Sequence, residues 1–255
     1  MSIKFDVFFK MVMSVLFVIS ANIALCEKPD AYEVMRLVDE NQHIVSARME
    51  AEMIIENRGR RMTKQMLSYV RTIDGESEAL TEFLNPRDRG TKYLKLADDL
   101  WMFFPDAEEL VKISGHMLRQ GMMGSDFSYE DILESDQLTQ LYDFEIVAKE
   151  SIDDRQAYVI NAVAKPDESP TYHIRKIWVD AQRYIVLKEQ LFSSSSRLLK
   201  ELTTVDARQF GERWLPIEQI MQDKLRRNTQ TTFKISEIIL DYQIPEGTIS
   251  LDALQ

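Results

Sequence analysis

The chain has a single cysteine, Cys26, so no disulfide can form within one molecule. Its three histidines, His43, His116 and His173, lie far apart and lack the spacing of metal ligands. The sequence also lacks a Gly-x-Ser-x-Gly elbow, a phosphate-binding loop and a dinucleotide fingerprint. These absences argue against an enzyme, and they predict neither a cofactor nor a bound metal.

Positive charge is also scarce, because 31 lysines and arginines stand against 42 aspartates and glutamates, a formal net charge of −11. A chain this acidic is a poor partner for nucleic acid and for anionic membranes. We therefore expect no nucleic-acid binding and only transient membrane contact. One local exception is the basic group of Lys224, Arg226 and Arg227, beside an expected hairpin tip at Asn228-Thr229. This group is either a contact for a phosphate headgroup or a membrane partner, or a solvated turn.

The N-terminal apolar run, residues 11–19, is about half as long as a membrane-spanning helix, which needs about twenty apolar residues. Lys4 and Lys10 precede this run and small residues follow it, so residues 1–26 have the layout of an export signal. We expect cleavage before Glu27, which would release a single domain, residues 27–255, into the periplasm.

Cys26 leaves two other processing routes open. It could be the lipidated first residue of a mature lipoprotein, although Leu25 is bulkier than the residue usual at that position. The remaining route is an uncleaved N-terminal anchor. Neither route changes the expectation that the chain is exported.

The rest of the sequence has the pattern of one helix followed by many strands. Pro29-Asp30 opens a stretch with helical spacing. Its expected apolar face is formed by Tyr32, Met35, Leu37 and Val38, with Ile44 and Val45 near the same line. From Arg48 the apolar period becomes two, which predicts a half-buried strand. The inward residues of that strand are expected to be Met49, Ala51, Met53 and Ile55.

Turn signals then recur at short intervals, which predicts an all-β barrel or sandwich with one dry face. They lie at Asn57-Arg58-Gly59, Asp74-Gly75, Asn85-Pro86, Asp98-Asp99, Asp153-Asp154, Asp180-Ala181 and Ser193 to Ser196. A large curved sheet has an interior that its own side chains do not fill, so it holds either a helix or a ligand cavity. The N-terminal helix and the segment after Ser114 are the predicted plugs.

The stretch from residue 96 to residue 133 combines large apolar side chains with glycines and polar edges. Methionine is unbranched and polarizable, so a wall of methionines can repack around ligands of different shape. We expect a strand that leads into a mobile lid, in which Gly115, Gly121 and Gly124 relieve backbone strain. The candidate cavity residues are Trp101, Met102, Phe103, Phe104, Met117, Leu118, Met122, Met123 and Phe127. The alternative is that these side chains form a closed core.

An enzymatic alternative can be drawn in the same stretch. His116, Ser125 and Asp126 have the residue types of a lipase-like triad. We prefer a structural role for the last two, because a helix is expected to begin just before Tyr129 and both residue types are common helix caps. His116 is expected at the surface, so no catalytic residue is assigned.

Two runs of this stretch, DLWMFFP at 99–105 and KISGHMLRQGMMGSDFSYEDI at 112–132, resemble the outer-membrane lipoprotein-sorting proteins of the LolA/LolB-like superfamily. Weaker similarity continues in KIWVDAQRYIVLKEQLF at 176–192 and RWLPIEQIMQDKLRRNTQTTFKI at 213–235. The resemblance therefore covers nearly all of the chain after the first thirty residues.

This resemblance implies a mainly β fold, an incomplete antiparallel β-barrel wrapped around α-helices, with a helical lid. It also implies a periplasmic carrier that takes acyl chains of lipoproteins or lipids from an inner-membrane donor complex to an outer-membrane acceptor. A lipid-acting hydrolase and a non-transporting envelope scaffold are the alternatives. No arginine here aligns with the cavity-facing arginine that helps to hold the lid closed in the well-studied carrier.

Overall fold

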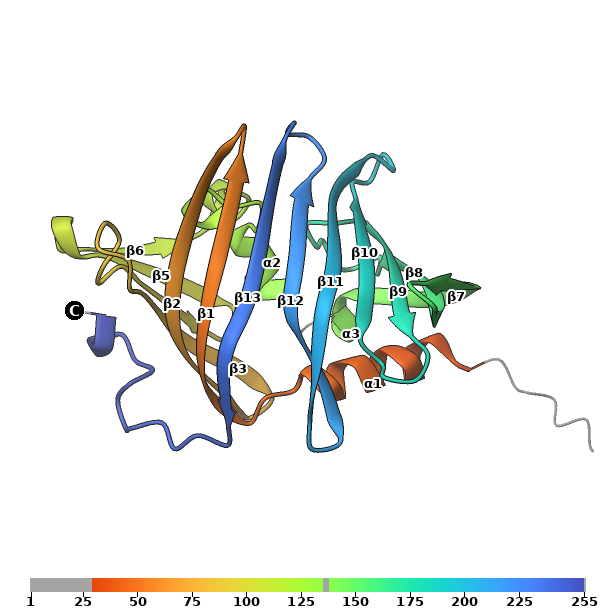
Figure 1. Cartoon of the computed structure of the whole chain (residues 1–255), viewed down its shortest axis with the longest axis horizontal. Helices are drawn as coiled ribbons and strands as arrows, with labels where there is room; N and C mark the ends of the chain where they lie inside the picture. Colours follow the sequence, from red (N-terminus) through yellow and green to blue (C-terminus); the bar gives the residue numbers. More distant parts are fainter. Residues whose placement is uncertain (1–28, 135–137, 255) are drawn as a thin grey trace, which may run out of the picture.

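The computed structural model describes residues 29–134 and 138–254, so the expected export signal and Cys26 lie outside the described residues. A single antiparallel sheet of thirteen strands is ordered β6-β5-β4-β3-β2-β1-β13-β12-β11-β10-β9-β8-β7 (Figure 1). The strands are β1 (Ser46–Asn57), β2 (Arg60–Ile73), β3 (Glu76–Phe83), β4 (Lys92–Leu96), β5 (Asp99–Phe104), β6 (Glu109–Ile113), β7 (Tyr142–Ile152), β8 (Arg155–Ala164), β9 (Ile174–Asp180), β10 (Val186–Phe192), β11 (Leu198–Phe210), β12 (Arg213–Asp223) and β13 (Thr229–Leu240). Within the described chain the edge strands β6 and β7 do not pair with each other, so the sheet stays open. The predicted incomplete antiparallel barrel is confirmed.

Most of the connections between these strands lie where the turn signals predicted them. Arg58-Gly59 and Asp74-Gly75 each form a two-residue turn with positive φ at both positions. Such turns match the twist of the strands that they join, and aspartate and glycine adopt positive φ with little strain. The turn predicted at Asp98-Asp99 is displaced by one residue, since Asp99 already begins β5.

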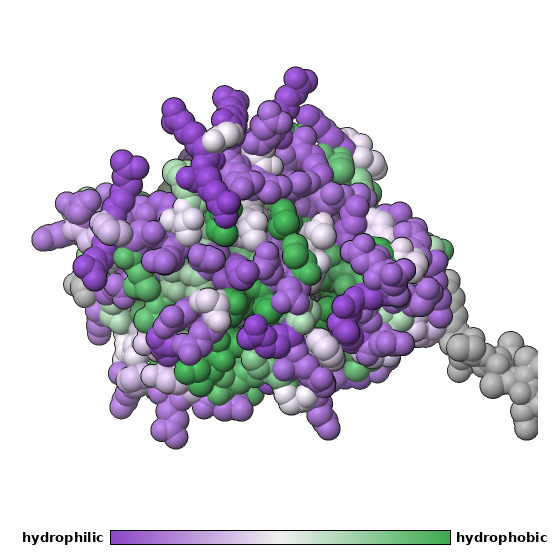
Figure 2. All heavy atoms as spheres, in the orientation of Figure 1, coloured by the Kyte–Doolittle hydropathy of each residue, from purple (hydrophilic) through white to green (hydrophobic). Residues whose placement is uncertain are grey.

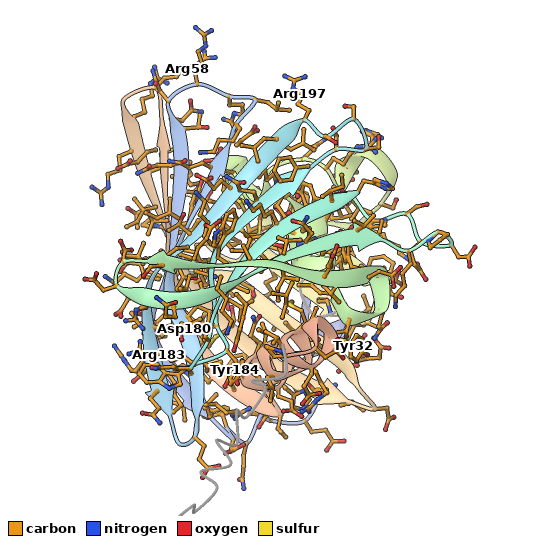
Figure 3. All side chains as sticks on the ribbon, turned by 90° about the vertical axis from the view of Figure 1, so that its right-hand side faces the viewer. Tyr32, Arg58, Asp180, Arg183, Tyr184 and Arg197 are labelled. Atoms are coloured by element: carbon orange, nitrogen blue, oxygen red, sulfur yellow. The ribbon has the colours of Figure 1, made fainter. Side chains whose placement is uncertain are left out.

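The predicted N-terminal helix is α1 (Ala31–Gln42), and Asp30 caps it by accepting a hydrogen bond from the Tyr32 backbone N–H at 3.3 Å. Its buried residues are Ala31, Val34, Met35 and Val38. The expected apolar face is therefore corrected at Tyr32, which is 51% exposed (Figure 3). The spacing i, i+3, i+4, i+7 begins at Ala31, which turns the next residue toward water.

The two edge strands are consecutive in the sequence, so the chain must cross the open side of the sheet to pass from β6 to β7. This connection, residues 114–141, is called the covering segment below. It contains η2 (Gly115–Met117), η3 (Met122–Gly124), α2 (Tyr129–Glu134) and α3 (Leu138–Leu141). Figure 1 draws α2 and α3 behind β13, β12 and β11. In the described part of the chain, no helix is both long and apolar enough to cross a membrane.

The sheet buries apolar side chains on both faces, which corrects the expectation of one dry face. The face that meets α1 and the covering segment is called the inner face. On the outer face, one cluster packs Leu80 and Leu94 under η4 (Asp252–Leu254), and another surrounds Trp178. Figure 2 shows the remaining apolar groups as separate patches among hydrophilic side chains.

Candidate functional site

The four apolar residues that end β5 do not form one wall, because successive strand residues point to opposite faces of a sheet. Met102 and Phe104 point to the inner face and pack in the cluster with the covering segment. Trp101 and Phe103 point to the outer face and pack near the chain's C-terminal residues. The structure therefore divides the predicted cavity residues of this strand into two pairs.

The predicted residues of the covering segment are also divided. Four of them pack on the same inner-face cluster as Met102 and Phe104, namely Met117, Leu118, Met122 and Met123. Phe127 lies in a neighbouring inner cluster with Tyr172, Leu191 and Met221. Six of the nine candidates are thus gathered on the inner face of β1–β6, where they cover Met53 and Phe83. Their role as ligand walls stays a prediction.

The methionines of this cluster are carried by irregular backbone. Met123 lies inside η3 with φ of 51°, and Gly124 follows with φ of 82°. At Gly121 the reason for glycine is steric, because an added Cβ would lie 2.2 Å from the backbone oxygen of Ser125. Single 3₁₀ turns have poorer hydrogen-bond geometry than an α-helix. Backbone hydrogen bonds within the segment, such as the one from the Met122 N–H to the Phe127 carbonyl at 2.8 Å, hold this irregular backbone together.

Tyr129 anchors the start of α2 against the sheet. Its hydroxyl lies 3.0 Å from the Tyr93 hydroxyl on β4 and 3.8 Å from the Met102 sulfur. Burial raises the pKa of both tyrosines, so both stay neutral and able to share this hydrogen bond. The pair joins the covering segment to the inner face by a polar contact inside an apolar cluster.

The residues of the enzymatic alternative are not assembled into a triad. His116 is exposed on η2, and no hydrogen bond joins it to Ser125 or Asp126 within the described residues. The Ser125 hydroxyl contacts the Phe127 backbone, and Asp126 accepts a hydrogen bond from Thr231 at 3.0 Å. The expected capping role of Ser125 and Asp126 is wrong as well.

The cap of α2 is made by Ser128 and Asp131. The Ser128 backbone N–H donates to an Asp131 carboxylate oxygen at 2.7 Å, and the Asp131 backbone N–H donates to the Ser128 hydroxyl at 3.4 Å. This reciprocal pair is a capping box, with aspartate in the third position of the helix. Ser125 and Asp126 lie too early in the chain to reach these amides.

A buried arginine fastens the end of α2. Arg175 on β9 pairs with Glu134 of α2 at 3.0 Å and with Glu189 of β10 at 3.0 Å, and its side chain is 7% exposed. It also lies over the rings of Tyr142 and Tyr172, 5.0 and 5.3 Å from the centroids. A cation shared by two carboxylates and two aromatic faces is well compensated, whereas each carboxylate alone would be costly to bury.

Further polar contacts fasten the rest of α2 and the loop before it. Lys200 of β11 pairs with Asp131 at 2.6 Å, and the Tyr172 hydroxyl donates to the other oxygen of Asp131 at 2.7 Å. Arg226, in the turn after β12, lies 3.6 Å from Asp126. The covering segment thus supplies the carboxylates and the other half of the sheet supplies the cations.

One carboxyl of α2 stays poorly compensated. An oxygen of Glu130 is buried without a hydrogen-bond partner in the described structure. Burial raises the pKa of the Glu130 carboxyl, and a hydrogen bond from Thr171 only partly offsets this effect. The covering segment therefore contains one buried carboxyl group that would be more stable if it were solvated or protonated.

Sequence reasoning missed these charged contacts. The available signal was Arg175, which stands in phase with the inward residues Ile177 and Val179 of its strand. A charge at an inward position indicates a buried partner. Its partner Glu134 is 41 residues away in the sequence, so the pattern alone could not identify it. In the described residues, no three histidine, cysteine, aspartate or glutamate side chains are placed to hold a metal ion.

Comparison with known proteins gives relatives for the whole described fold. A family model described as an uncharacterized protein matches residues 75–255. A DUF1329 family protein from Desulfovibrio piger is 23% identical with a TM-score of 0.82, over 88% of this chain and 97% of its own. A putative outer membrane lipoprotein-sorting protein domain from Vibrio parahaemolyticus is 22% identical with a TM-score of 0.78, over 88% and 97%.

A LolA superfamily protein from Nitrosomonas europaea is 20% identical with a TM-score of 0.72, over 89% of this chain and all of its own. No curated protein matches the chain by sequence. At these identities the solved structures establish a shared fold.

Proposed function

We propose that this chain, which belongs to the family whose model matches residues 75–255 and shares its fold with a LolA superfamily protein, binds the acyl chains of lipoproteins or lipids between the inner face and the covering segment. We further propose that it shuttles this cargo toward the outer membrane. The chain's own residues, not a cofactor, would do this work. The role is binding and release, without a chemical step.

The observation that carries the proposal is the way in which the inner face of β1–β6 is covered. Its cover is a connection of short helices whose apolar side chains include the three methionines Met117, Met122 and Met123. Methionine side chains repack at low cost, and apolar ligand pockets use such adaptable walls. An acyl chain that displaced Met122 and Met123 would meet Met53, Met66 and Phe83 beneath them.

A carrier of this kind has a simple thermodynamic purpose. Each buried methylene is worth about 0.8 kcal/mol, so a chain of roughly sixteen carbons faces a cost of about 12 kcal/mol on entering water. A protein that encloses the chain removes most of this cost. Release then requires contacts that an acceptor can replace, and methionine contacts are suited to that exchange.

The cellular setting forms part of the same proposal. With the expected export signal, the protein would work in the periplasm, between an inner-membrane donor complex and an outer-membrane acceptor. The net charge of −11 opposes stable adhesion to anionic membranes, so transfer would require the acceptor. Tight binding of the empty protein to acidic liposomes, lost in high salt, would contradict this part.

The test is uptake of an acyl-chain fluorophore, with two adjacent phenylalanines as a matched pair. Phe104 points to the inner face and Phe103 to the outer face of the same strand. Phe104→Ala should weaken uptake, whereas Phe103→Ala should change only the melting temperature. Met123→Ala should weaken uptake with little loss of stability, and Met122→Asp should abolish uptake because an unpaired carboxylate is costly in an apolar site.

Lipid retained by the natively purified protein should be identified by mass spectrometry in parallel. If the wild type binds no acyl probe, the carrier proposal fails. It fails equally if Phe103→Ala and Phe104→Ala reduce uptake by the same factor, because the inner face would then have no special role.

A further inference from the structure

We propose that the tips of the β1–β2 and β12–β13 hairpins form a binding site for the phosphate of an amphiphile's headgroup. This inference rests on the proposed function and names the cargo class more closely. The two tips lie side by side, since the Arg58 backbone N–H donates to the Asn228 carbonyl at 2.9 Å. They bring together six basic residues in a chain of net charge −11, namely Arg58, Arg60, Arg61, Lys224, Arg226 and Arg227.

A pocket of about 700 Å³ between the tips is strongly cationic. Its lining residues are Asn57, Arg58, Arg60, Met62, Arg226, Arg227 and Thr229, with no carboxylate among them. Within the described chain Arg58, Arg60 and Arg227 form no ion pair. Guanidinium groups bind phosphate oxygens in pairs with good geometry, so several unpaired arginines around one pocket favour a phosphate ligand.

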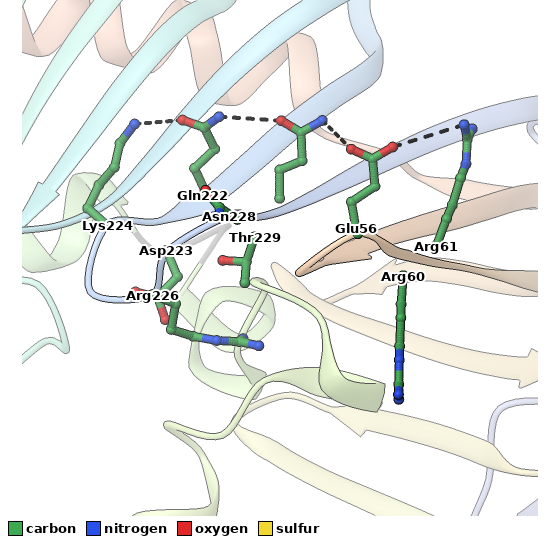
Figure 4. Close-up of a pocket in the computed structure, with 11 residues that line it drawn as sticks. Glu56, Arg60, Arg61, Gln222, Asp223, Lys224, Arg226, Asn228 and Thr229 are labelled. Carbon is green, nitrogen blue, oxygen red and sulfur yellow. Dashed lines mark hydrogen bonds and ion pairs between the residues drawn. The ribbon is translucent and has the colours of Figure 1, made fainter.

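An adjoining pocket at the same two hairpin tips, drawn in Figure 4, is crossed by a row of polar contacts. Lys224 donates to Gln222 at 2.6 Å, and Gln230 donates to Glu56 at 2.8 Å (Figure 4). Figure 4 shows this row continuing to Arg61, while Arg60 points away from it. Arg61 is thereby engaged with Glu56 and Arg60 is left for a ligand.

The strand register places the free arginine on the cargo side of the sheet. Arg60 is opposite Asn57, and Met62 is opposite Ile55. Ile55 belongs to the buried inner cluster, and alternate strand residues share a face, so Arg60 and Met62 point to the inner side. Met62 is 42% exposed, lines the cationic pocket, and is paired across the strands with Ile55 of that cluster.

This arrangement favours an amphiphile over free phosphate. A headgroup phosphate among the arginines would have its apolar part directed along Met62 toward Ile55, under the covering segment. Arg226 supports the same placement, since it lines the pocket and also lies 3.6 Å from Asp126 of the covering segment. The hydroxyl oxygen of Thr229, another lining residue, is buried without a partner in the described structure, so it can donate to the ligand.

The experiment measures the affinity of the full chain for three soluble probes. Dihexanoyl phosphatidic acid has the phosphate and the tails, dihexanoylglycerol has only the tails, and inorganic phosphate has only the anion. We expect phosphatidic acid to bind at least tenfold more tightly than either of the other two. Its affinity should fall with increasing salt.

The matched variants remove the same charge from different places. Arg60→Gln/Arg227→Gln should reduce the affinity for phosphatidic acid at least tenfold, to the level of dihexanoylglycerol. Arg61→Gln/Arg197→Gln should change it less than twofold, because neither residue lines the pocket and Arg197 lies on another turn at the same end of the molecule (Figure 3). Circular dichroism should show both variants folded.

Three outcomes would overturn the inference. They are equal affinities for phosphatidic acid and dihexanoylglycerol, equal losses in the two double variants, and inorganic phosphate binding as tightly as phosphatidic acid. In each case uptake of the neutral acyl fluorophore would leave the proposed carrier function intact. Conversely, phosphate-dependent binding at the tips without uptake of any neutral acyl probe would sink the carrier proposal alone.

Discussion

The two halves of the inner face are covered in different ways. Over β7–β10, α1 and its neighbours pack on branched aliphatic side chains such as Ile160, Ile177 and Val179, all of which are fully buried. The end of α1 is tied to the sheet by Asn41, which donates to the carbonyls of Arg183 and Tyr184 at 2.6 and 3.0 Å. This half has a rigid helix on a close-packed core.

Over β1–β6 the cover consists of short helices, methionines and ion pairs. Its apolar contacts include Met117, Met122 and Met123, and its charged contacts reach across to Arg175 and Lys200. Branched side chains fix one packing, whereas methionines permit several and ion pairs can exchange with water. If the proposed carrier function holds, we expect α1 to stay in place and the covering segment to be the part that the cargo displaces.

The largest expected effect comes from removing the buried ion pairs that fasten the covering segment. Arg175→Met leaves Glu134 and Glu189 buried without a counter-charge, which should cost about 3–5 kcal/mol of unfolding free energy. Denaturant unfolding measures this loss. Arg36→Met is the control, because the described partners of Arg36 are two exposed glutamates of α1, and its loss should be far smaller than that of Arg175→Met. Equal losses would show that the buried pairs do not hold the fold.

The next effect sharpens the contrast between the two sets of methionines. Met35, on the buried face of α1, is fully buried, so Met35→Ala should destabilise the protein by about 2–5 kcal/mol. Met123→Ala, in the displaceable cover, should cost markedly less because its surroundings can repack. Thermal unfolding of the two variants beside the wild type measures the difference. A larger loss for Met123→Ala would reverse the assignment of rigid and displaceable covers.

A smaller effect should be confined to one half of the molecule. Gly121→Ala places a Cβ against the Ser125 carbonyl, so it should cost about 1–3 kcal/mol and loosen the covering segment. Hydrogen exchange should accelerate in residues 114–134 and stay unchanged in α1. Gly124→Ala is the control, since its Cβ would meet open space and only the positive φ opposes it. Faster exchange throughout the chain would mean that the two halves unfold together.

The smallest effect depends on pH. The pKa of Glu130 is raised by burial, so the folded state binds the proton more tightly than the unfolded state does. The charged form therefore costs stability above the raised pKa, and this cost disappears as the pH falls below the unfolded value near 4. Glu130→Gln should raise the free energy of unfolding at pH 7 by less than about 1 kcal/mol, which appears as a higher melting temperature. At pH 4 the substitution should have little effect.

The pKa of Glu201 is shifted in the opposite direction to that of Glu130, so its effect on stability should also be opposite. Burial alone would raise its pKa, but hydrogen bonds from Gln190, Lys224 and Lys188 lower the pKa to about 2. Its contribution to stability is present above the unfolded value and is lost as the pH falls toward 2. Glu201→Gln should therefore lower the melting temperature at pH 7. If both glutamine variants shifted the melting temperature in the same direction, burial of Glu130 would not be the cause.

The parts that could be predicted from the sequence are those determined by local chemistry. Turn pairs such as Asp74-Gly75 and the alternation from Arg48 located the strands, and Asp30 located the start of α1. The division of Trp101 and Phe103 from Met102 and Phe104 was missed because an unbroken apolar run hides its alternation. The ion pairs of the covering segment depend on which strands become neighbours, and no local pattern contains that information.

The covering segment is joined to the sheet at both of its ends, because it continues directly from β6 and into β7. A lid attached at one end could rotate away from the inner face. The covering segment is attached at both ends, so only its middle part could move outward. The 28 residues between the two strands have a contour length of about 90 Å, which sets the limit of that movement. Spreading the two edges of the barrel would draw the covering segment tight. Under the proposed carrier function, the length of this connection would therefore limit the size of the largest cargo that the barrel can admit.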